Sequence, residues 1–163
     1  LAIVISLLII MGNAYFVALI LFIAAGITDY FDGYFARKYN ATSEIGEILD
    51  PIADKVLIVF LLITLSVNLS SFLLAFSSSL IISREIWVSA LRDYSARNNI
   101  SNATKVTYLA KVKTSVQLFT LMLYLVGLAF KSMIFIVLAD FFIILSVLVT
   151  VYTGYMYTKN VFK

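Results

Sequence analysis

The stretch "ITDYFDGYFARKYNATSEIGEILDPIADKVLIVF" runs from Ile27 to Phe60 and decides how the rest of the chain is interpreted. It contains six of the nine acidic residues, while the sequence on both sides of it is almost entirely apolar. These six acids are Asp29, Asp32, Glu44, Glu47, Asp50 and Asp54. Because charge is costly in and beside a bilayer, a cluster of this kind needs a physical reason.

The composition indicates an integral membrane protein. Of the 163 residues, 63% are hydrophobic, and the mean hydropathy is +1.04, whereas soluble domains are nearer half apolar. The apolar residues form blocks of roughly twenty, about what an α-helix needs to cross the hydrocarbon core. We therefore predict an all-α membrane bundle of six transmembrane helices, a single domain over residues 1–163. The expected helices cover roughly 1–12, 14–36, 46–66, 70–93, 106–129 and 133–158.

The first of these helices is expected to be incomplete. The chain begins at Leu1 instead of methionine, and its opening apolar run of about twelve residues is too short to span a bilayer. We interpret the run as the end of a truncated helix, with an N-terminal segment missing. A cleaved signal peptide explains it less well, because no basic region precedes the run.

The basic residues predict the orientation in the membrane. Eleven of the twelve lie at the second-to-third connection, around the fourth-to-fifth connection or near the C-terminus, and Lys131 is the exception. By the positive-inside rule that side, which also carries the acidic cluster, faces the cytoplasm. The cations suit anionic lipid headgroups, and they favour no nucleic-acid partner, because they flank membrane segments instead of forming a soluble basic face.

The chain contains no cysteine and no histidine. Disulfides, thiolate metal sites and cysteine catalysis are therefore excluded, and the commonest general base is absent. Any metal must be held by oxygen atoms, which favours Mg²⁺, Mn²⁺ or Ca²⁺.

Helical spacing places the aspartates of the cluster on two narrow faces. On the second helix, one arc of about 100° carries Asp29, Asp32, Gly33 and Ala36. On the third helix, an arc of about 80° carries Gly46, Asp50 and Asp54. If these two faces are turned toward each other, four carboxylates converge opposite small residues.

Four converging carboxylates need compensation, because like charges repel. Divalent cations provide it, and four aspartates supply enough oxygens for one or two Mg²⁺ ions. The small residues leave room for a ligand, and Arg37 beside them suits a phosphate. The pattern therefore predicts a metal-assisted site for a diphosphate. The alternative is that the acids are solvated helix-end charges, paired with Arg37, Lys38 and Lys55.

Two pairs of segments resemble sequence motifs of a known protein family. "DYFDGYFAR" (Asp29 to Arg37) and "GEILDPIAD" (Gly46 to Asp54) resemble the complete signature of the CDP-alcohol phosphatidyltransferase family. "SREIWVSALRDYSARNN" (Ser83 to Asn99), followed by "LAKVKTSVQ" (Leu109 to Gln117), resembles the bacterial phosphatidylglycerophosphate synthases within it. The resemblance covers nearly the whole chain. It departs at the start, where the short amphipathic segment usual in the family is absent.

The resemblance implies a reaction and a set of roles. CDP-diacylglycerol and sn-glycerol 3-phosphate would give phosphatidylglycerophosphate and CMP, at a site in the inner (cytoplasmic) membrane that faces the cytoplasm. The ligands of two Mg²⁺ or Mn²⁺ ions would be Asp29, Asp32, Asp50 and Asp54. Asp54 would also be the general base that takes the proton of the glycerol hydroxyl. The cytidine diphosphate pocket would be formed by Asp29, Asp32, Gly33, Ala36, Arg37 and Gly46.

An acceptor that carries its own phosphate also needs a cationic pocket. The candidates are Arg84, Arg92, Lys111 and Lys113, and the alternative for each is an anchoring charge at the membrane surface. Asp140 lies far from the cluster, and we expect it to have a structural role in packing the bundle or a homodimer.

Other functions remain open. The same family contains enzymes with other acceptors, such as cardiolipin synthases and the phosphatidylserine and phosphatidylinositol phosphate synthases. A small cation transporter would also gather acids in a membrane, but transporters tend to place them near the midplane in broken helices. A catalytically inactive assembly protein is disfavoured by the full set of four aspartates.

Overall fold

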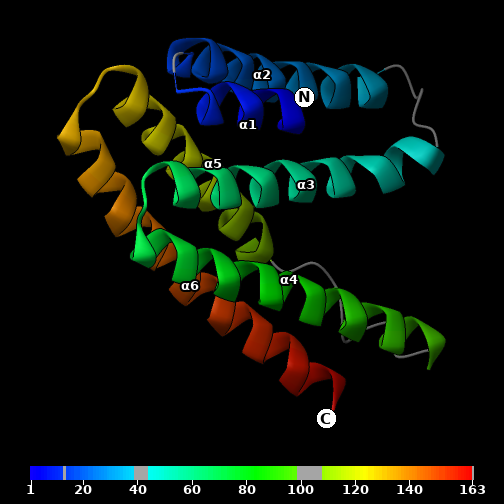
Figure 1. The fold of residues 1–163 in the computed structure, drawn as a ribbon. Coiled ribbons are helices and arrows are strands. Elements are labelled where there is room, and N and C mark those ends of the chain that lie inside the picture. The colour runs from blue at the N-terminus through cyan, green and yellow to red at the C-terminus, as the bar shows by residue number, and fades with distance from the viewer. Residues whose placement is uncertain (13, 39–43, 99–107, 163) are drawn as a thin grey trace.

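The computed structural model describes residues 1–12, 14–38, 44–98 and 108–162, with the side chains of 36, 37, 44–51 and 108–111 outside the description. The described residues form six α-helices and no strand (Figure 1). The helices are α1 (Ala2–Ile10), α2 (Tyr15–Lys38), α3 (Glu44–Asn68), α4 (Phe72–Arg97), α5 (Tyr108–Ala129) and α6 (Met133–Val161). All six predicted helices are confirmed. The largest differences are at the ends of α4 and α6, which continue beyond the predicted 93 and 158.

Tight turns join the helices at one end of the bundle. Each contains a residue with positive φ: Gly12 at 74°, Ser70 at 47° and Lys131 at 50°. Such a conformation reverses the chain within a few residues and ends the preceding helix. Ser71 then caps the start of α4, because its side-chain oxygen accepts a hydrogen bond from the Leu74 amide at 3.2 Å.

Four of the described helices are long and apolar enough to cross a membrane. The spans are Tyr15–Phe35, Phe72–Arg97, Val112–Ala129 and Met133–Val161. On α6, Ile134, Phe141 and Leu148 recur every seven residues and are all exposed, as expected of a face turned to lipid. These findings support a multi-pass membrane protein, whereas membrane crossing by all six helices stays a prediction. The nine residues of α1 are too few for a span.

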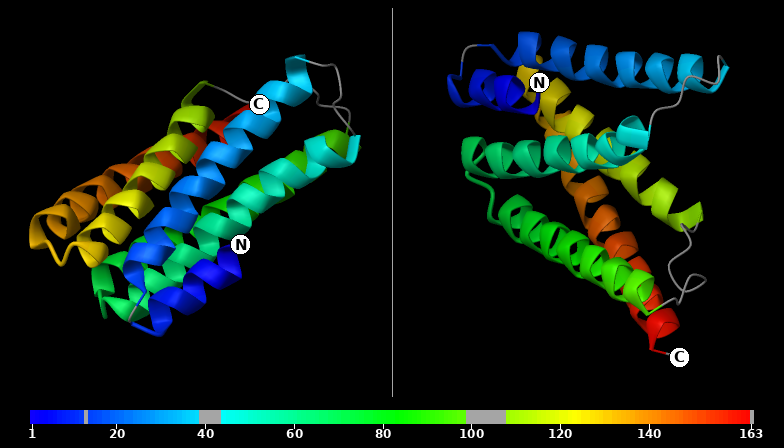
Figure 2. Two further views of the ribbon diagram at one scale, coloured as in Figure 1. Left: turned by 90° about the horizontal axis from the view of Figure 1, so that it is seen from above. Right: turned by 90° about the vertical axis from the view of Figure 1, so that its right-hand side faces the viewer.

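The helices are not packed in chain order. α6 runs beside α5 and also contacts α4, and α5 contacts α2 and α3. α1 contacts both α2 and α3, which make no close backbone contact with each other within the described residues. The two signature helices are therefore held apart along much of their length, as Figure 1 and Figure 2 show.

The bundle has two chemically different ends. At one end lie the three tight turns, and at the other lie the C-terminal ends of α2, α4 and α6 with the N-terminal ends of α3 and α5 (Figure 1, Figure 2). The acidic signature and most of the basic residues belong to this second end, as the distribution of lysine and arginine along the sequence predicts.

Two hydrogen bonds between polar groups inside the bundle join neighbouring helices. Tyr124 of α5 is fully buried, and its hydroxyl donates to Oδ1 of Asp140 on α6 at 2.6 Å. The Asn68 amide of α3 donates to the Ile9 carbonyl of α1 at 3.1 Å. The contact with Tyr124 is consistent with the structural role expected for Asp140, since it joins two helices far from the acidic cluster.

Candidate active site

Two cavities lie next to each other between the helices. The first, of about 450 Å³, is formed by α3, α4 and α5. The second, of about 700 Å³, is formed mainly by α1, α2, α3 and α5. Asp54 of α3 lines both cavities. The last aspartate of the signature therefore stands where the two cavities meet.

The second cavity brings together acids from both signature helices. Asp29 of α2 and Asp54 of α3 line it, and most of its remaining wall is apolar, with Phe22, Leu57 and Met122 among the side chains. Asp32 is exposed and does not belong to this lining. The structure thus unites one acid of each signature segment on a single cavity.

The rest of the predicted acidic and nucleotide-binding set is only partly described. Gly33 is half-buried on α2. The side chains at Ala36, Arg37, Gly46 and Asp50 lie outside the described residues. Among the side chains that are described, no group of three or more acids is placed to hold a metal ion. The convergence of all four aspartates consequently stays a prediction.

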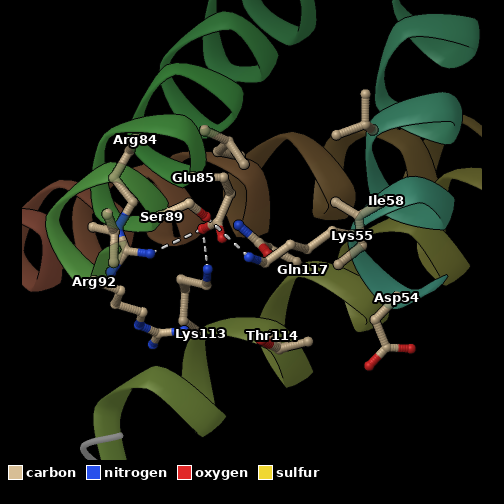
Figure 3. Close-up of a pocket in the computed structure, with 13 residues that line it drawn as sticks. Asp54, Lys55, Ile58, Arg84, Glu85, Ser89, Arg92, Lys113, Thr114 and Gln117 are labelled. Carbon is tan, nitrogen blue, oxygen red and sulfur yellow. Dashed lines mark hydrogen bonds and ion pairs between the residues drawn. The ribbon is translucent and has the colours of Figure 1, made fainter. Parts of the chain in front are cut away.

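The first cavity is cationic. Its lining includes four basic side chains and two acids: Lys55, Arg84, Arg92, Lys113, Asp54 and Glu85. Figure 3 shows Arg84, Lys55 and Lys113 directed toward Glu85 and Ser89, while Asp54 stands at the margin with its carboxylate turned away from Glu85. Three of the four predicted acceptor-phosphate residues therefore share one cavity, and the side chain of the fourth, Lys111, lies outside the described residues.

Arg84 links α4 to α6. Its Nε donates to the Thr150 carbonyl at 3.1 Å and its Nη2 to the Thr153 hydroxyl at 2.8 Å, while Nη1 lies 2.9 Å from Glu85 Oε1. Gly154 of α6 leaves space for the Arg84 side chain, because a Cβ at position 154 would lie only 3.1 Å from Arg84 Cγ. Since each nitrogen already has an acceptor, the contacts favour a positioning role for Arg84 over direct binding of a phosphate.

Glu85 and Lys113 form an ion pair between α4 and α5. The Lys113 ammonium donates to Oε1 of Glu85, the same oxygen that Arg84 contacts. Lys113 is only 6% exposed. A buried cation in a membrane helix is costly unless it is paired. Glu85 is therefore the group that allows Lys113 to stand in the wall of the cavity.

Arg92 has hydrogen-bonding capacity left for a ligand. Its guanidinium lies over the ring of Tyr157, 5.5 Å from the centroid, and its Nη2 is 3.5 Å from the Tyr157 hydroxyl. Its Nε is buried and has no hydrogen-bond partner among the described residues. Because buried N–H groups are nearly always satisfied, this atom is available to a hydrogen-bond acceptor in the cavity, such as water or an anion.

Lys55 brings a third helix to the cationic cavity. Its ammonium donates to Ser89 Oγ on α4 at 3.2 Å. From the sequence, Lys55 is expected to lie on the cytoplasmic side and to serve as a counter-ion of the acidic cluster, and its part in this cavity was not predicted.

Glu85 was also missed, although the sequence contains a signal for it. An acid in the middle of an apolar helix is by default a functional candidate. Gln117 also lines this cavity and donates to the Thr150 hydroxyl at 3.4 Å. Nothing in the sequence around Gln117 predicts that position.

The described residues thus form an all-helical, membrane-type bundle in which the last signature aspartate adjoins a cationic cavity. The sequence profile of the CDP-alcohol phosphatidyltransferase family matches residues 1–152. The chain therefore belongs to this family.

Individual relatives carry a more specific name. The chain is 42% identical over 107 residues to the CDP-diacylglycerol–glycerol-3-phosphate 3-phosphatidyltransferase of Wigglesworthia glossinidia brevipalpis, covering 66% of this chain and 59% of the relative. It is 38% identical over 143 residues to the Rickettsia felis protein of the same name, covering 86% and 76%. The Escherichia coli K12 protein of that name is 36% identical over 106 residues, covering 65% and 58%. The chain thus spans less than two thirds of two of these three relatives.

Proposed function

We propose that the chain is an enzyme that transfers the phosphatidyl group of CDP-diacylglycerol to sn-glycerol 3-phosphate, giving phosphatidylglycerophosphate and CMP. The observation that carries this proposal is the cationic cavity beside Asp54. In a CDP-alcohol phosphatidyltransferase, a basic cavity that adjoins the last signature aspartate fits an acceptor with its own phosphate. The names of the bacterial relatives point to the same reaction.

The second cavity suits the lipid donor. Its mostly apolar wall, with Asp29 and Asp54 as its acids, can take the part of CDP-diacylglycerol where the headgroup meets the glycerol backbone. The acyl chains can remain in the bilayer while the headgroup reacts. Gly33, Ala36, Arg37 and Gly46 are proposed to line the nucleotide portion of this site.

The acids fit a divalent metal. Asp29 and Asp54 bring carboxylate oxygens from two helices to one cavity, and oxygen ligands are those that Mg²⁺ and Mn²⁺ prefer. We propose that Asp32 and Asp50 complete a site for two ions. When bound, such ions would neutralise the diphosphate and make CMP a better leaving group.

Asp54 is proposed to move the proton. The acceptor hydroxyl oxygen attacks the phosphorus that bears the lipid, and the bond from this phosphorus to the bridging oxygen of the diphosphate breaks, so that CMP departs. The hydroxyl proton passes to the Asp54 carboxylate, which stands at the junction of the donor and acceptor cavities. Arg92 and Lys113 hold the acceptor phosphate, so much of the rate enhancement comes from positioning.

The proposed setting is the inner membrane of a bacterial cell. The basic residues on one side of the bundle support an active site that faces the cytoplasm. A homodimer is compatible with the exposed apolar faces of the helices, and it remains a proposal.

A product assay with a panel of acceptors tests the proposal. The purified chain is incubated with CDP-diacylglycerol, Mg²⁺ and, separately, glycerol 3-phosphate, phosphatidylglycerol, serine or inositol phosphate. We expect lipid product and CMP with glycerol 3-phosphate only. A product formed only with another acceptor would refute the assignment of glycerol 3-phosphate. Cation flux in liposomes without any release of CMP would favour a transporter.

A further inference from the structure

We propose that Glu85 is a positioning residue of the acceptor site, which fixes Lys113 in the cavity wall and sets the charge that an anionic acceptor meets. The identity of that acceptor rests on the proposed function. The relation between Glu85, its cations and an anion in the cavity rests on the structure of the cavity alone.

Glu85 stands where three helices meet. Its Oε1 receives hydrogen bonds from Arg84 on its own helix and from Lys113 on α5. Lys55 of α3 approaches from the third side and donates to Ser89, one turn further along α4. Figure 3 shows these side chains gathered around the Glu85 carboxylate. Loss of this carboxylate would therefore remove the acceptor that Arg84 and Lys113 share, and Lys113 would lose its ion-pair partner.

Glu85 also affects how strongly the cavity attracts anions, because it offsets part of the positive charge there. Four cations line the cavity against two carboxylates, Glu85 and Asp54, and Asp54 is turned away from the cluster. Without Glu85, the cluster would consist of cations only, and it would attract any small anion strongly. Glu85 thus limits the affinity of the cavity for anions.

The hydrogen bonds of the three buried or half-buried cations also indicate where in the cavity an anion can bind. Arg84 is engaged by Thr150, Thr153 and Glu85. Lys113 gives one of its three N–H groups to Glu85 and retains others for a ligand. Within the part of the chain that the structure describes, the buried Nε of Arg92 has no hydrogen-bond partner. A phosphate is therefore expected between Arg92 and Lys113, and Glu85 keeps the lysine in place for it.

The variant Glu85→Gln tests the proposal, because it keeps the shape of the side chain and removes its charge. We expect binding of inorganic phosphate, measured by calorimetry in detergent micelles, to become about fivefold tighter, since one negative charge leaves the cavity. We expect kcat with glycerol 3-phosphate to fall about tenfold, since a neutral amide holds Lys113 less firmly than a carboxylate does, while KM for CDP-diacylglycerol stays unchanged.

Asp93→Asn is the matched control. Asp93 lies on the same helix, is exposed and pairs with Arg97 outside the cavity. Its replacement removes the same charge from α4, and we expect unchanged phosphate affinity and unchanged kcat. Glu85→Asp is the second variant, in case Glu85→Gln fails to fold. It keeps the charge but shortens the side chain, so phosphate affinity should match the wild type while kcat falls.

Two results would overturn the inference. One is phosphate affinity that does not change in Glu85→Gln, or that changes equally in Asp93→Asn. The other is a kcat that survives in both Glu85 variants. If the wild-type chain forms no phosphatidylglycerophosphate, the proposed function fails, but the comparison of phosphate affinities still decides whether Glu85 controls the charge of the cavity.

Discussion

Asp54 lines both the donor and the acceptor cavities, and in our account its carboxylate accepts the proton of the attacking hydroxyl. Asp54→Asn keeps the size of the side chain and removes the base. General-base catalysis contributes about 10²- to 10⁴-fold, so we expect kcat to fall at least about 100-fold while KM for glycerol 3-phosphate changes little. Initial rates of CMP release measure both. Retention of more than about a tenth of wild-type kcat would exclude Asp54 as the base.

Arg92 is the residue on which recognition of the acceptor phosphate depends most directly. Hydrogen bonds to charged groups contribute about 1.5–3 kcal/mol, so Arg92→Met should raise KM for glycerol 3-phosphate about 10- to 100-fold. KM for CDP-diacylglycerol should stay unchanged, because Arg92 lines only the acceptor cavity.

Arg97→Met provides the control for that variant. Arg97 lies on the same helix, is exposed and pairs with Asp93. Steady-state kinetics should separate the two variants, with Arg97→Met close to the wild type. An equal rise of KM in both would mean that the positive surface, and not the half-buried guanidinium of Arg92 in the cavity, attracts the acceptor.

At the residue scale the sequence predicted the candidates whose partners are close in the chain. The aspartate signature depends on spacing within two helices, so it is visible in the sequence. The role of Glu85 depends on Lys113, and that of Arg84 depends on Thr150 and Thr153 of α6. Such pairings arise only from tertiary packing, and the sequence alone could not assign them.

Among the elements, α5 and α6 approach closely at a glycine. A Cβ on Gly127 would lie 2.6 Å from Ile136 Cγ1 and 3.2 Å from the backbone nitrogen of Ile136. Gly127→Ala should therefore push the two helices apart and destabilise the protein by about 1–3 kcal/mol. Unfolding in detergent, followed by circular dichroism against denaturant, measures this change.

Gly26→Ala is the comparison for that prediction. Gly26 lies inside α2, where a Cβ would meet nothing within 4 Å. The same substitution should there be neutral or stabilise by about 0.5–1 kcal/mol, through the higher helix propensity of alanine. Equal stability of the two variants would show that the α5–α6 contact tolerates a methyl group.

At the element scale the sequence predicted most of the fold. Hydropathy places each helix, because a membrane segment must be both apolar and hydrogen-bonded within itself. The ends of α4 and α6 were placed several residues too early, because helical structure continues into polar sequence there. Membrane crossing by α1 and α3 stays a prediction. The four other helices are the ones whose length and hydropathy suffice for a membrane span.

At the scale of the whole molecule, the two cavities divide the proposed reaction between a lipid side and a water-soluble side. The sequence did not predict this division, because it depends on α1 standing between α2 and α3 and on α6 crossing α4. Helix pairing in a membrane is set by local packing of small and polar side chains, which leaves little periodic signal.

Removal of divalent metal should stop the reaction of the whole enzyme. If the signature aspartates hold Mg²⁺ or Mn²⁺, EDTA should reduce CMP release to background, and an excess of Mg²⁺ should restore it. Unfolding in the presence of EDTA serves as the control for loss of structure. Full activity after exhaustive chelation would contradict the proposed metal site.

The most direct test of the account is a time course in which CMP and phosphatidylglycerophosphate are measured together, with and without glycerol 3-phosphate. The account predicts that both products form in equal amounts, and only when both substrates are present. Release of CMP at the same rate without glycerol 3-phosphate, or no release under any condition, would contradict phosphatidyl transfer to this acceptor.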